Sequence, residues 1–328
     1  MKKSSQFINE SIFKVNLKYT QMQNRTKELF FQCLNDNKPL EYFEIELEKL
    51  WGTLDHEFLQ NELLEYAELI HQQNIQGRQF KPDLIKTGII TIPIVNALLM
   101  EKKFKKSKER EYKLSVNSYA YKNDKQEYLK QKVSKYTNQI VPYYYKKTNT
   151  IQRYVQLNTY EAMIHNTNLT RAGWNTTLND ADMLGEREFW IPPHNFSCPI
   201  CSAFQGKILS KQDVMRHIGI EAEEVSGDLL HPNCKCELTI YTLNTVLRQP
   251  KYDEEEIERQ YEIRQKVNGL TLKKEEVATD MKIQKQLGNQ DQVDELNTQR
   301  NAINKAIREL KSALPTAELQ KQVVAINR

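Results

Sequence analysis

Four of the five cysteines stand in two short pairs that have the spacing of metal ligands. Cys198 and Cys201 are separated by two residues, and Cys234 and Cys236 by one. A thiolate is a good ligand for Zn²⁺, and a Cys-x-x-Cys turn can direct both of its sulfur atoms at one ion. Two such pairs, joined by a loop, can complete a tetrahedral site. The sequence therefore predicts that the two pairs bind one structural zinc ion.

Histidines near the cysteines widen the set of candidate ligands. His231 lies three residues before Cys234, whereas His194 and His217 lie farther from both pairs. A site made by all four clustered cysteines is the first expectation. Replacement of Cys236 by His231 as the fourth ligand is the second, and the sequence leaves this choice open.

Other uses of the cysteines fit less well, although unliganded thiols remain an alternative. A redox Cys-x-x-Cys follows a strand at the start of a helix, whereas here Pro199 follows the first cysteine and no strand pattern precedes it. A catalytic zinc keeps one position open and commonly recruits a carboxylate base. The acidic residues of the intervening loop lack a diagnostic spacing, so we expect a protein that is not an enzyme. Cys33 stands alone in a helical pattern and is expected to be a core residue.

The cysteines lie in a stretch whose composition differs from its surroundings. From Asn179 to Thr242 prolines and turn residues cluster, and short apolar runs at 207–209 and 237–241 predict strands. Such a domain has a minimal core, so an ion that closes the loop would supply much of its stability. We place this small α+β domain at residues 151–249, with a leading helix over 150–175 that closes at Ala172-Gly173.

Helices are expected before this domain. Glycine is scarce, 10 residues of 328, and apolar residues recur at helical intervals over 6–35 and 40–74. These patterns predict one helix and then a second helix or helix pair in an N-terminal region of residues 1–100. The apolar stretch 88–100 is too short to span a bilayer, and we expect a buried helix entered near Pro93. Neither a conventional transmembrane segment nor a secretory signal is expected.

The C-terminal region, residues 250–328, is expected to form a coiled-coil-like helical hairpin. Asp253 can cap a helix whose first turn contains three glutamates. After Gly288, apolar residues recur at alternating intervals of three and four, with Arg300 as the polar exception. An antiparallel helix pair that turns at Gly288 accounts for this pattern. The pair could offer a surface to a partner or fold back on the main body, and the sequence leaves both open.

Positive charge is concentrated in residues 101–150. This segment has 14 Lys and Arg against 5 Asp and Glu, a net charge of +9 in a chain whose total is +4. It also holds nine aromatic residues, and basic and aromatic side chains together can bind a phosphate backbone and stack on bases. We expect a mostly helical segment that ends near Val141-Pro142. Its predicted contacts with double-stranded DNA are Lys102, Lys103, Lys105, Lys106, Lys108 and Arg110. The alternative is a solvated helix whose tyrosines pack inward.

The segments around the cysteines resemble a known protein family. Phe196 to Ile208 contains Cys-Pro-Ile-Cys followed by Gly-Lys, and Leu230 to Leu238 contains His-Pro-Asn-Cys-Lys-Cys. Both are similar to the signature of the phage head-morphogenesis family, the minor capsid proteins of Mu F type, which closes with His-Pro-Asn-Cys-Arg-Cys. Lys235 stands where arginine is usual, and His165 to Asn168 replaces the usual Arg-Thr-Glu run upstream. The resemblance is specific over about residues 195–240 and weaker over 150–195.

This resemblance implies a low-copy virion protein that acts in head morphogenesis. It implies contact with the portal protein and the inner capsid or scaffold, a location inside the phage head after assembly in the host cytoplasm, and for some members a part in genome ejection. Because no base-reading motif is evident, we expect any contact with packaged DNA to be non-specific. The expected fold is mainly α and elongated, with helical N-terminal and C-terminal regions on either side of a small zinc-stapled α+β domain.

Two other classes of function stay open. Proteins with this head module are sometimes joined to toxin domains, either ADP-ribosyltransferases or nucleases, and Glu221-Ala-Glu223 superficially matches the Glu-x-Glu of a transferase without its Ser-Thr-Ser strand. For a nuclease, His231 and Asn233 stand close together, but metal ligation explains them better. A zinc-ribbon regulator of nucleic acid would need a basic metal domain. Residues 151–250 instead have 8 Lys and Arg against 11 Asp and Glu, a net charge of −3.

Overall fold

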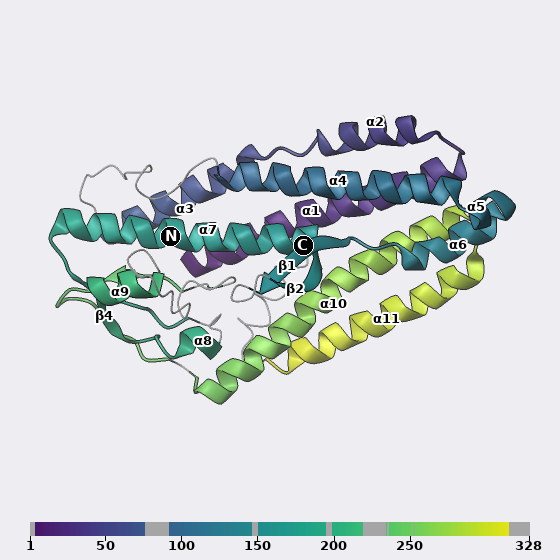
Figure 1. The fold of residues 1–328 in the computed structure, drawn as a ribbon. Helices are drawn as coiled ribbons and strands as arrows, with labels where there is room; N and C mark the ends of the chain where they lie inside the picture. The colour runs from purple at the N-terminus through teal and green to yellow at the C-terminus, as the bar shows by residue number, and fades with distance from the viewer. Residues whose placement is uncertain are drawn as a thin grey trace.

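The computed structural model describes residues 4–75, 92–145, 150–194, 199–218, 234, 236–250 and 252–314. Most of these residues are helical, and the expected fold class, mainly α and elongated with a small α+β region, is confirmed (Figure 1). The helices are α1 (Ser4–Asn35), α2 (Leu40–Trp51), α3 (Glu57–Ile75), α4 (Ile92–Asn117), α5 (Tyr119–Asn123), α6 (Lys125–Lys135), α7 (Leu157–Leu184), α8 (Pro199–Ser202), α9 (Lys211–Ile218), α10 (Glu254–Gln286) and α11 (Gln290–Ser312). The strands are β1 (Gln139–Tyr145), β2 (Thr150–Gln156), β3 (Glu188–Trp190), β4 (Ile208–Ser210) and β5 (Thr239–Ile240).

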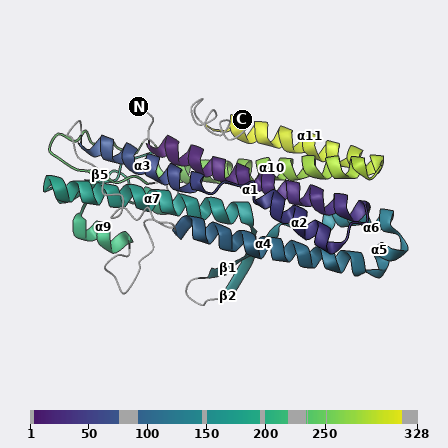
Figure 2. The same cartoon turned by 90° about the horizontal axis from the view of Figure 1, so that it is seen from above.

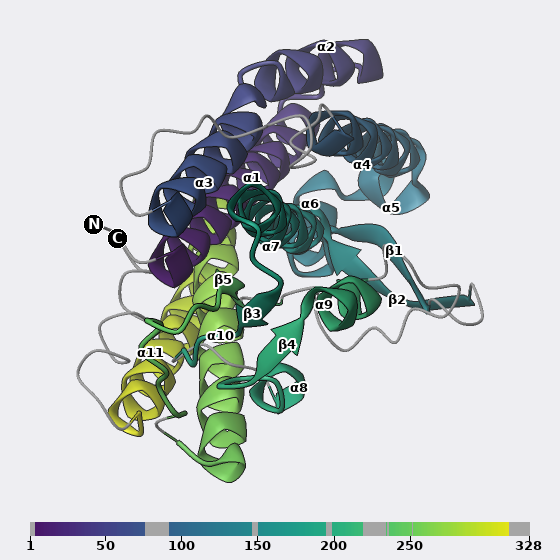
Figure 3. The same ribbon diagram turned by 90° about the vertical axis from the view of Figure 1, so that its left-hand side faces the viewer.

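Helices α1, α2, α3, α4, α6 and α7 form the helical bundle, with α7 at its centre in the end-on view (Figure 3). Its core is rich in aromatic rings: Phe43 stacks on Tyr112 with centroids 4.4 Å apart, and Phe30 meets both rings edge-on. Such ring pairs add about 0.5–1.5 kcal/mol each beyond the apolar area that they bury. The predicted helix over 6–35 and helix pair over 40–74 are confirmed. The bundle therefore has a large apolar core of its own.

Helix α7 is longer than the sequence pattern predicts. The expected helix over 150–175, closing at Ala172-Gly173, is wrong at both ends, because α7 starts at Leu157 and continues to Leu184. Gly173 serves packing, since a methyl group there would lie 2.6 Å from Cε1 of Tyr66 on α3. The helix ends instead at Gly185, whose φ of 76° is a left-handed conformation that suits glycine.

The basic segment is not helical throughout. Its helical part, α4 to α6, ends at Lys135 with α6, and β1 then pairs with β2 in an antiparallel hairpin. The expected helical end near Val141-Pro142 is wrong because Pro142 has no N–H to donate and the surrounding β-branched and tyrosine residues favour strands. Residues 100 and 101, where we placed a domain boundary, lie inside α4, which begins directly before Pro93 as expected. No described helix has both the length and the apolar character that crossing a membrane requires.

The C-terminal helical hairpin is confirmed. Asp253 accepts a hydrogen bond from the backbone N–H of Glu256, and the chain turns at Gly288, whose φ is 68°. Helix α10 folds back on the bundle, where Ile283 and Leu287 enter the aromatic core. Helix α11 packs along α10 on the side away from α4 (Figure 2).

The elements from Glu188 to Ile240 form what we call the small module. Its three strands are antiparallel in the order β4-β3-β5. The strands predicted at 207–209 and 237–241 are confirmed as β4 and β5, whereas the central strand β3 was not predicted. Trp174 and Leu178 of α7 pack with Phe189 of β3 in its core. The small module therefore uses α7 as one wall, and it lies beside one end of that helix (Figure 1).

Candidate metal centre

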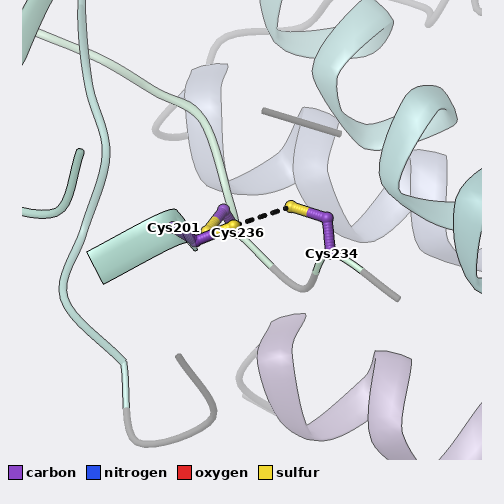
Figure 4. Close-up of side chains that lie close together, drawn as sticks. All are labelled: Cys201, Cys234 and Cys236. Atoms are coloured by element: carbon purple, nitrogen blue, oxygen red, sulfur yellow. Dashed lines mark hydrogen bonds between the residues drawn. The ribbon is translucent and has the colours of Figure 1, made fainter. Parts of the chain in front are cut away.

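Three of the predicted ligands meet in the small module. Sγ atoms of Cys201, Cys234 and Cys236 all lie within 4.8 Å of one another, and each residue is only 1% exposed (Figure 4). The Sγ atoms of Cys201 and Cys234 are 3.5 Å apart. Two thiolates on a tetrahedral zinc ion, each about 2.3 Å from it, would be about 3.8 Å apart. The three thiols are therefore placed so that they could hold a metal ion.

The fourth position is not defined by this geometry. Cys198 and His231, the other predicted ligands, lie outside the described residues, so the choice between them stays a prediction. Among the described residues, the three cysteines are the only group of three or more potential metal ligands of the Cys, His, Asp and Glu types. Within that part of the chain, the structure offers no competing metal site.

Cys201 is placed by a tight turn that leads from α8 into β4. The N–H of Phe204 donates to the carbonyl of Cys201 at 3.1 Å, and the N–H of Gly206 donates to the carbonyl of Ile191 at 2.9 Å. Gly206 has a φ of 77°, the left-handed conformation that side chains rarely adopt. The Gly-Lys of the sequence signature is therefore the place where the Cys201 segment is tied to Ile191, directly after β3.

Cys234 is placed by two side chains of α7. The amide Nδ2 of Asn166 and the hydroxyl Oγ1 of Thr170 donate to its carbonyl oxygen, at 3.0 and 2.9 Å. Both side chains are about 1% exposed. The sequence reasoning missed both residues, although they stand four apart on a helix that precedes the cysteines.

Cys236 and the residues after it are held in the same way. Nε1 of Trp174 donates to the carbonyl of Cys236 at 2.8 Å, and Oγ1 of Thr177 donates to the carbonyl of Leu238 at 3.0 Å. With Asn166 and Thr170, these residues follow intervals of four, four and three on one face of α7. We call the four residues the donor row. A helical series of donors beside a cysteine-rich segment is the signal that could have found them.

Burial dominates the electrostatics around the cysteines. Tyr66, which packs against Gly173, has its pKa raised well above the usual value by burial, and the charges of Glu237 and Cys234 add to that rise. Cys33 lies far away in the aromatic core, as expected, and burial raises its pKa to about 11. Cys33 therefore stays a protonated thiol at neutral pH and is inert compared with a metal-bound thiolate.

The predicted DNA contacts divide into three groups. Lys102, Lys103, Lys106 and Arg110 are exposed and, within the described part of the chain, none forms an ion pair. Lys105 is half-buried and pairs with Glu48 of α2 at 2.5 Å. Exposed Lys113 continues the first group, because positions 102, 106, 110 and 113 fall on one side of α4. We call Lys102, Lys103, Lys106, Arg110 and Lys113 the basic row.

Lys108 does not belong to this surface. It is 1% exposed, pairs with Glu111 at 3.0 Å and donates to the carbonyl of Thr137. Its ammonium group also lies 4.1 Å from the centre of the Tyr136 ring. Burial lowers the pKa of Lys108, and Glu111 opposes that shift. The prediction that Lys108 contacts DNA is therefore wrong, because its charge is satisfied inside the bundle.

Most of the described tyrosines of the basic segment pack inward. Tyr112 and Tyr136 are buried, and Tyr121 donates its hydroxyl to the carbonyl of Leu34 at 2.6 Å. Tyr119, by contrast, is 82% exposed. The alternative interpretation, in which the aromatic residues stabilise the fold, is therefore correct for these three side chains. Among the tyrosines of this segment whose side chains the structure describes, Tyr119 is the one exposed enough to stack on bases.

A comparison with protein-family models, curated proteins and solved structures finds no match. The resemblance to phage head-morphogenesis proteins therefore rests on the signature residues around the cysteines alone. Residues Glu221, Glu223, His231 and Asn233, on which the enzymatic alternatives depend, lie outside the described residues.

Proposed function

We propose that the chain binds one structural zinc ion, which fixes the small module against the helical bundle. The observation that carries this proposal is the meeting of three buried thiols from two segments that are 33 residues apart. A tetrahedral, sulfur-rich donor set favours zinc over magnesium and calcium, which prefer oxygen ligands. Cys198 or His231 would supply the remaining ligand. Bound zinc would supply a closed tetrahedral link between the Cys201 turn and the Cys234 segment.

A structural role fits the surroundings of these thiols better than a catalytic one. All three cysteines are 1% exposed and pack among the apolar side chains of the small module. A catalytic zinc needs an open position that a substrate can reach. An ion enclosed in this way stabilises the folded chain instead, because the unfolded chain has no preformed site.

The test of zinc binding is a metal analysis of the purified protein, combined with thiol labelling. We expect about one zinc per chain, with Cys201, Cys234 and Cys236 protected from a thiol reagent until a chelator is added. Cys201→Ser should lose the metal, whereas Cys33→Ser, which changes a buried thiol of the bundle, should keep it. Protein that contains no zinc and whose cysteines of the small module react at once would contradict the proposal.

We further propose that the protein is a non-enzymatic component of phage head assembly that binds the portal and inner capsid. The resemblance of the cysteine segments to the minor capsid signature supports this role. An elongated helical body that carries a small module at one end also fits a part in assembly (Figure 1). The neighbouring genes provide the first test, because a portal gene upstream and a scaffold or major capsid gene downstream are expected. A purified portal protein should then retain the chain, and absence of the chain from purified particles would contradict the role.

The basic row supports a second part of this role, non-specific contact with packaged double-stranded DNA. Five exposed cations on one side of α4 could neutralise successive phosphates. Acidic residues also lie near this helix: burial and then the charges of Glu44 and Glu48 on α2 raise the pKa of Glu109 on α4. We expect retention on duplex DNA that weakens steeply with salt. Lys102→Glu with Lys106→Glu should reduce it strongly, whereas Lys305→Glu with Arg308→Glu, exposed on α11, should not. Equal retention of both double variants would contradict the proposed DNA surface.

Enzymatic activity would overturn the non-enzymatic part of the proposal. Release of nicotinamide that Glu223→Ala abolishes would indicate a transferase. DNA nicking that His231→Ala abolishes would indicate a nuclease.

A further inference from the structure

The carbonyl oxygen of Cys234 accepts two hydrogen bonds from α7. The donors are Nδ2 of Asn166 at 3.0 Å and Oγ1 of Thr170 at 2.9 Å. A carbonyl oxygen has two lone pairs and can accept both bonds, although the single hydroxyl hydrogen of Thr170 is shared with the carbonyl of Asn166, 3.0 Å away in the same helix. The carbonyls of Cys236 and Leu238 each accept one bond from the donor row. The firmest attachment to α7 is therefore at the residue that carries one of the clustered sulfur atoms.

Asn166 is a buried amide whose nitrogen has a specific acceptor on the cysteine segment. It is 1% exposed, and its amide oxygen has no hydrogen-bond partner among the described residues. Burying an unsatisfied polar atom is unfavourable. The bond from its amide nitrogen to Cys234 is what offsets this cost. Asn166 is therefore better explained by its acceptor than by packing of α7.

We propose that Asn166 and Thr170 are positioning residues of the metal centre. They do not bind the ion themselves, but they hold Cys234 in the position from which it can bind the ion. This inference rests on the proposed zinc site. With its carbonyl fixed on α7, the peptide group after Cys234 cannot rotate freely, and Sγ stays 3.5 Å from Sγ of Cys201. The ion then meets a half-formed site and does not have to order the second cysteine segment. The cost of ordering that segment is met when the chain folds, so affinity for the ion rises.

This arrangement also explains why the metal would connect the small module to the bundle. Helix α7 packs on α1 and α3 and at the same time carries the second cysteine segment. Cys201 comes from the opposite side, on α8, which contacts α10. An ion shared by Cys201 and Cys234 would thus join a part fixed to α7 with a part that is not. Removal of the ion should release the α8 side first.

Three buried threonines of α7 make a matched experiment possible. Thr170 donates to the carbonyl of Cys234 and also to that of Asn166 in its own helix, Thr177 donates to Leu238, and Thr176 donates to the carbonyl of Ala172 in its own helix. Each is at most 1% exposed. Thr170→Val therefore removes the bond to the cysteine segment together with a bond within α7, Thr177→Val removes the bond to Leu238, and Thr176→Val is the control that removes a bond within α7 alone.

The measurement is zinc affinity of the full chain, by competition with a chromogenic chelator, together with the sulfur-to-cobalt charge-transfer spectrum of the Co²⁺-substituted protein. We expect Thr170→Val to weaken zinc affinity about 10-fold, the lower end of the effect of residues that orient metal ligands, and to alter the cobalt spectrum. Thr176→Val should change neither, and Thr177→Val should have an intermediate effect on affinity. Thr170→Ser, which keeps the hydroxyl, should restore wild-type affinity.

Equal affinity and identical spectra for Thr170→Val and Thr176→Val would overturn the positioning role while leaving the zinc site in place. Failure of Thr170→Ser to restore affinity would also overturn it, because loss of the methyl group would then explain the effect. If the wild-type chain binds no zinc, the proposed function and this inference fall together. Should Thr170→Val not fold, Asn166→Ala replaces it with the same expected 10-fold loss.

Discussion

The helical bundle and the small module are held together in different ways. In the bundle, Phe30 contacts four other aromatic rings, and the core extends over most of the length of α1. In the small module, the strands are two or three residues long and the cysteines themselves form part of the apolar cluster. In a large core, the free energy gained by burying apolar surface can by itself outweigh the entropy cost of ordering the chain. A small one cannot, so hydrogen bonds from α7 and the proposed ion add what is missing.

Loss of the metal should show the difference between the two regions most clearly. With a strong chelator, or in Cys234→Ser, we expect the small module to lose its order while the bundle stays helical, because the bundle core contains none of the clustered cysteines. Hydrogen exchange should show β4, which follows α8, losing protection first, with α1 still protected. Simultaneous loss of protection in both regions would mean that they unfold as one unit.

Phe30→Ala should have the opposite effect. Removing this buried ring from the aromatic core should lower the free energy of unfolding of the bundle by about 3–5 kcal/mol, and the zinc content of the folded protein should not change. Urea denaturation followed by circular dichroism measures the first, and metal analysis the second. Tyr119→Ala, at an 82% exposed position, serves as a control with an expected change within about 0.5 kcal/mol.

Gly173→Ala tests the helix that both regions share. The added methyl group would lie 2.6 Å from Tyr66, so α7 and α3 must separate or the ring must move, at a cost of about 1–3 kcal/mol. Gly269→Ala in α10 adds the same methyl group where nothing lies within 4 Å. There the change should stabilise the protein by up to about 1 kcal/mol. Equal thermal shifts of the two variants would contradict the close packing of α3 on α7.

The pH dependence of the bundle tests a carboxyl group buried in the same helix. Burial, with the charge of Glu101 added, raises the pKa of Glu161 to about 8. The folded chain therefore holds a proton that the unfolded chain has released, and stability falls as pH rises through 8. Between pH 6.5 and 8.5 this loss should be roughly 2 kcal/mol. Tyr19, Tyr160 and Glu101 are the other ionisable groups that act on this carboxyl or are affected by it.

Glu161→Gln should remove this dependence, because the amide does not titrate. Urea denaturation at the two pH values compares the variant with the wild type, and metal content provides the control for the small module. A wild-type loss that Glu161→Gln retains in full would assign the effect to other groups.

Part of this architecture follows from local sequence patterns. The periodicity over 6–35 and 40–74 predicted α1, α2 and α3, and Asp253 and Gly288 marked the start of α10 and the turn after it. The spacing of the cysteines predicted that Cys201, Cys234 and Cys236 would meet. The β1–β2 hairpin was not predicted because its tyrosine-rich sequence is compatible with either periodicity over so short a span. Gly173 was taken for a helix end because a glycine that allows close packing and one that ends a helix look the same in sequence.

The sequence by itself determined the helices with strong periodicity, the caps and the two cysteine pairs, because each depends on residues within a few positions of one another. Only the tertiary structure decided which charges are available and which side chains support the cysteines. Lys108 is buried because Thr137 and Tyr136, far along the chain, surround its ammonium group. Thr170 lies 64 residues from the carbonyl that it reaches. Such contacts are set by how α7 packs, and no local pattern encodes that packing.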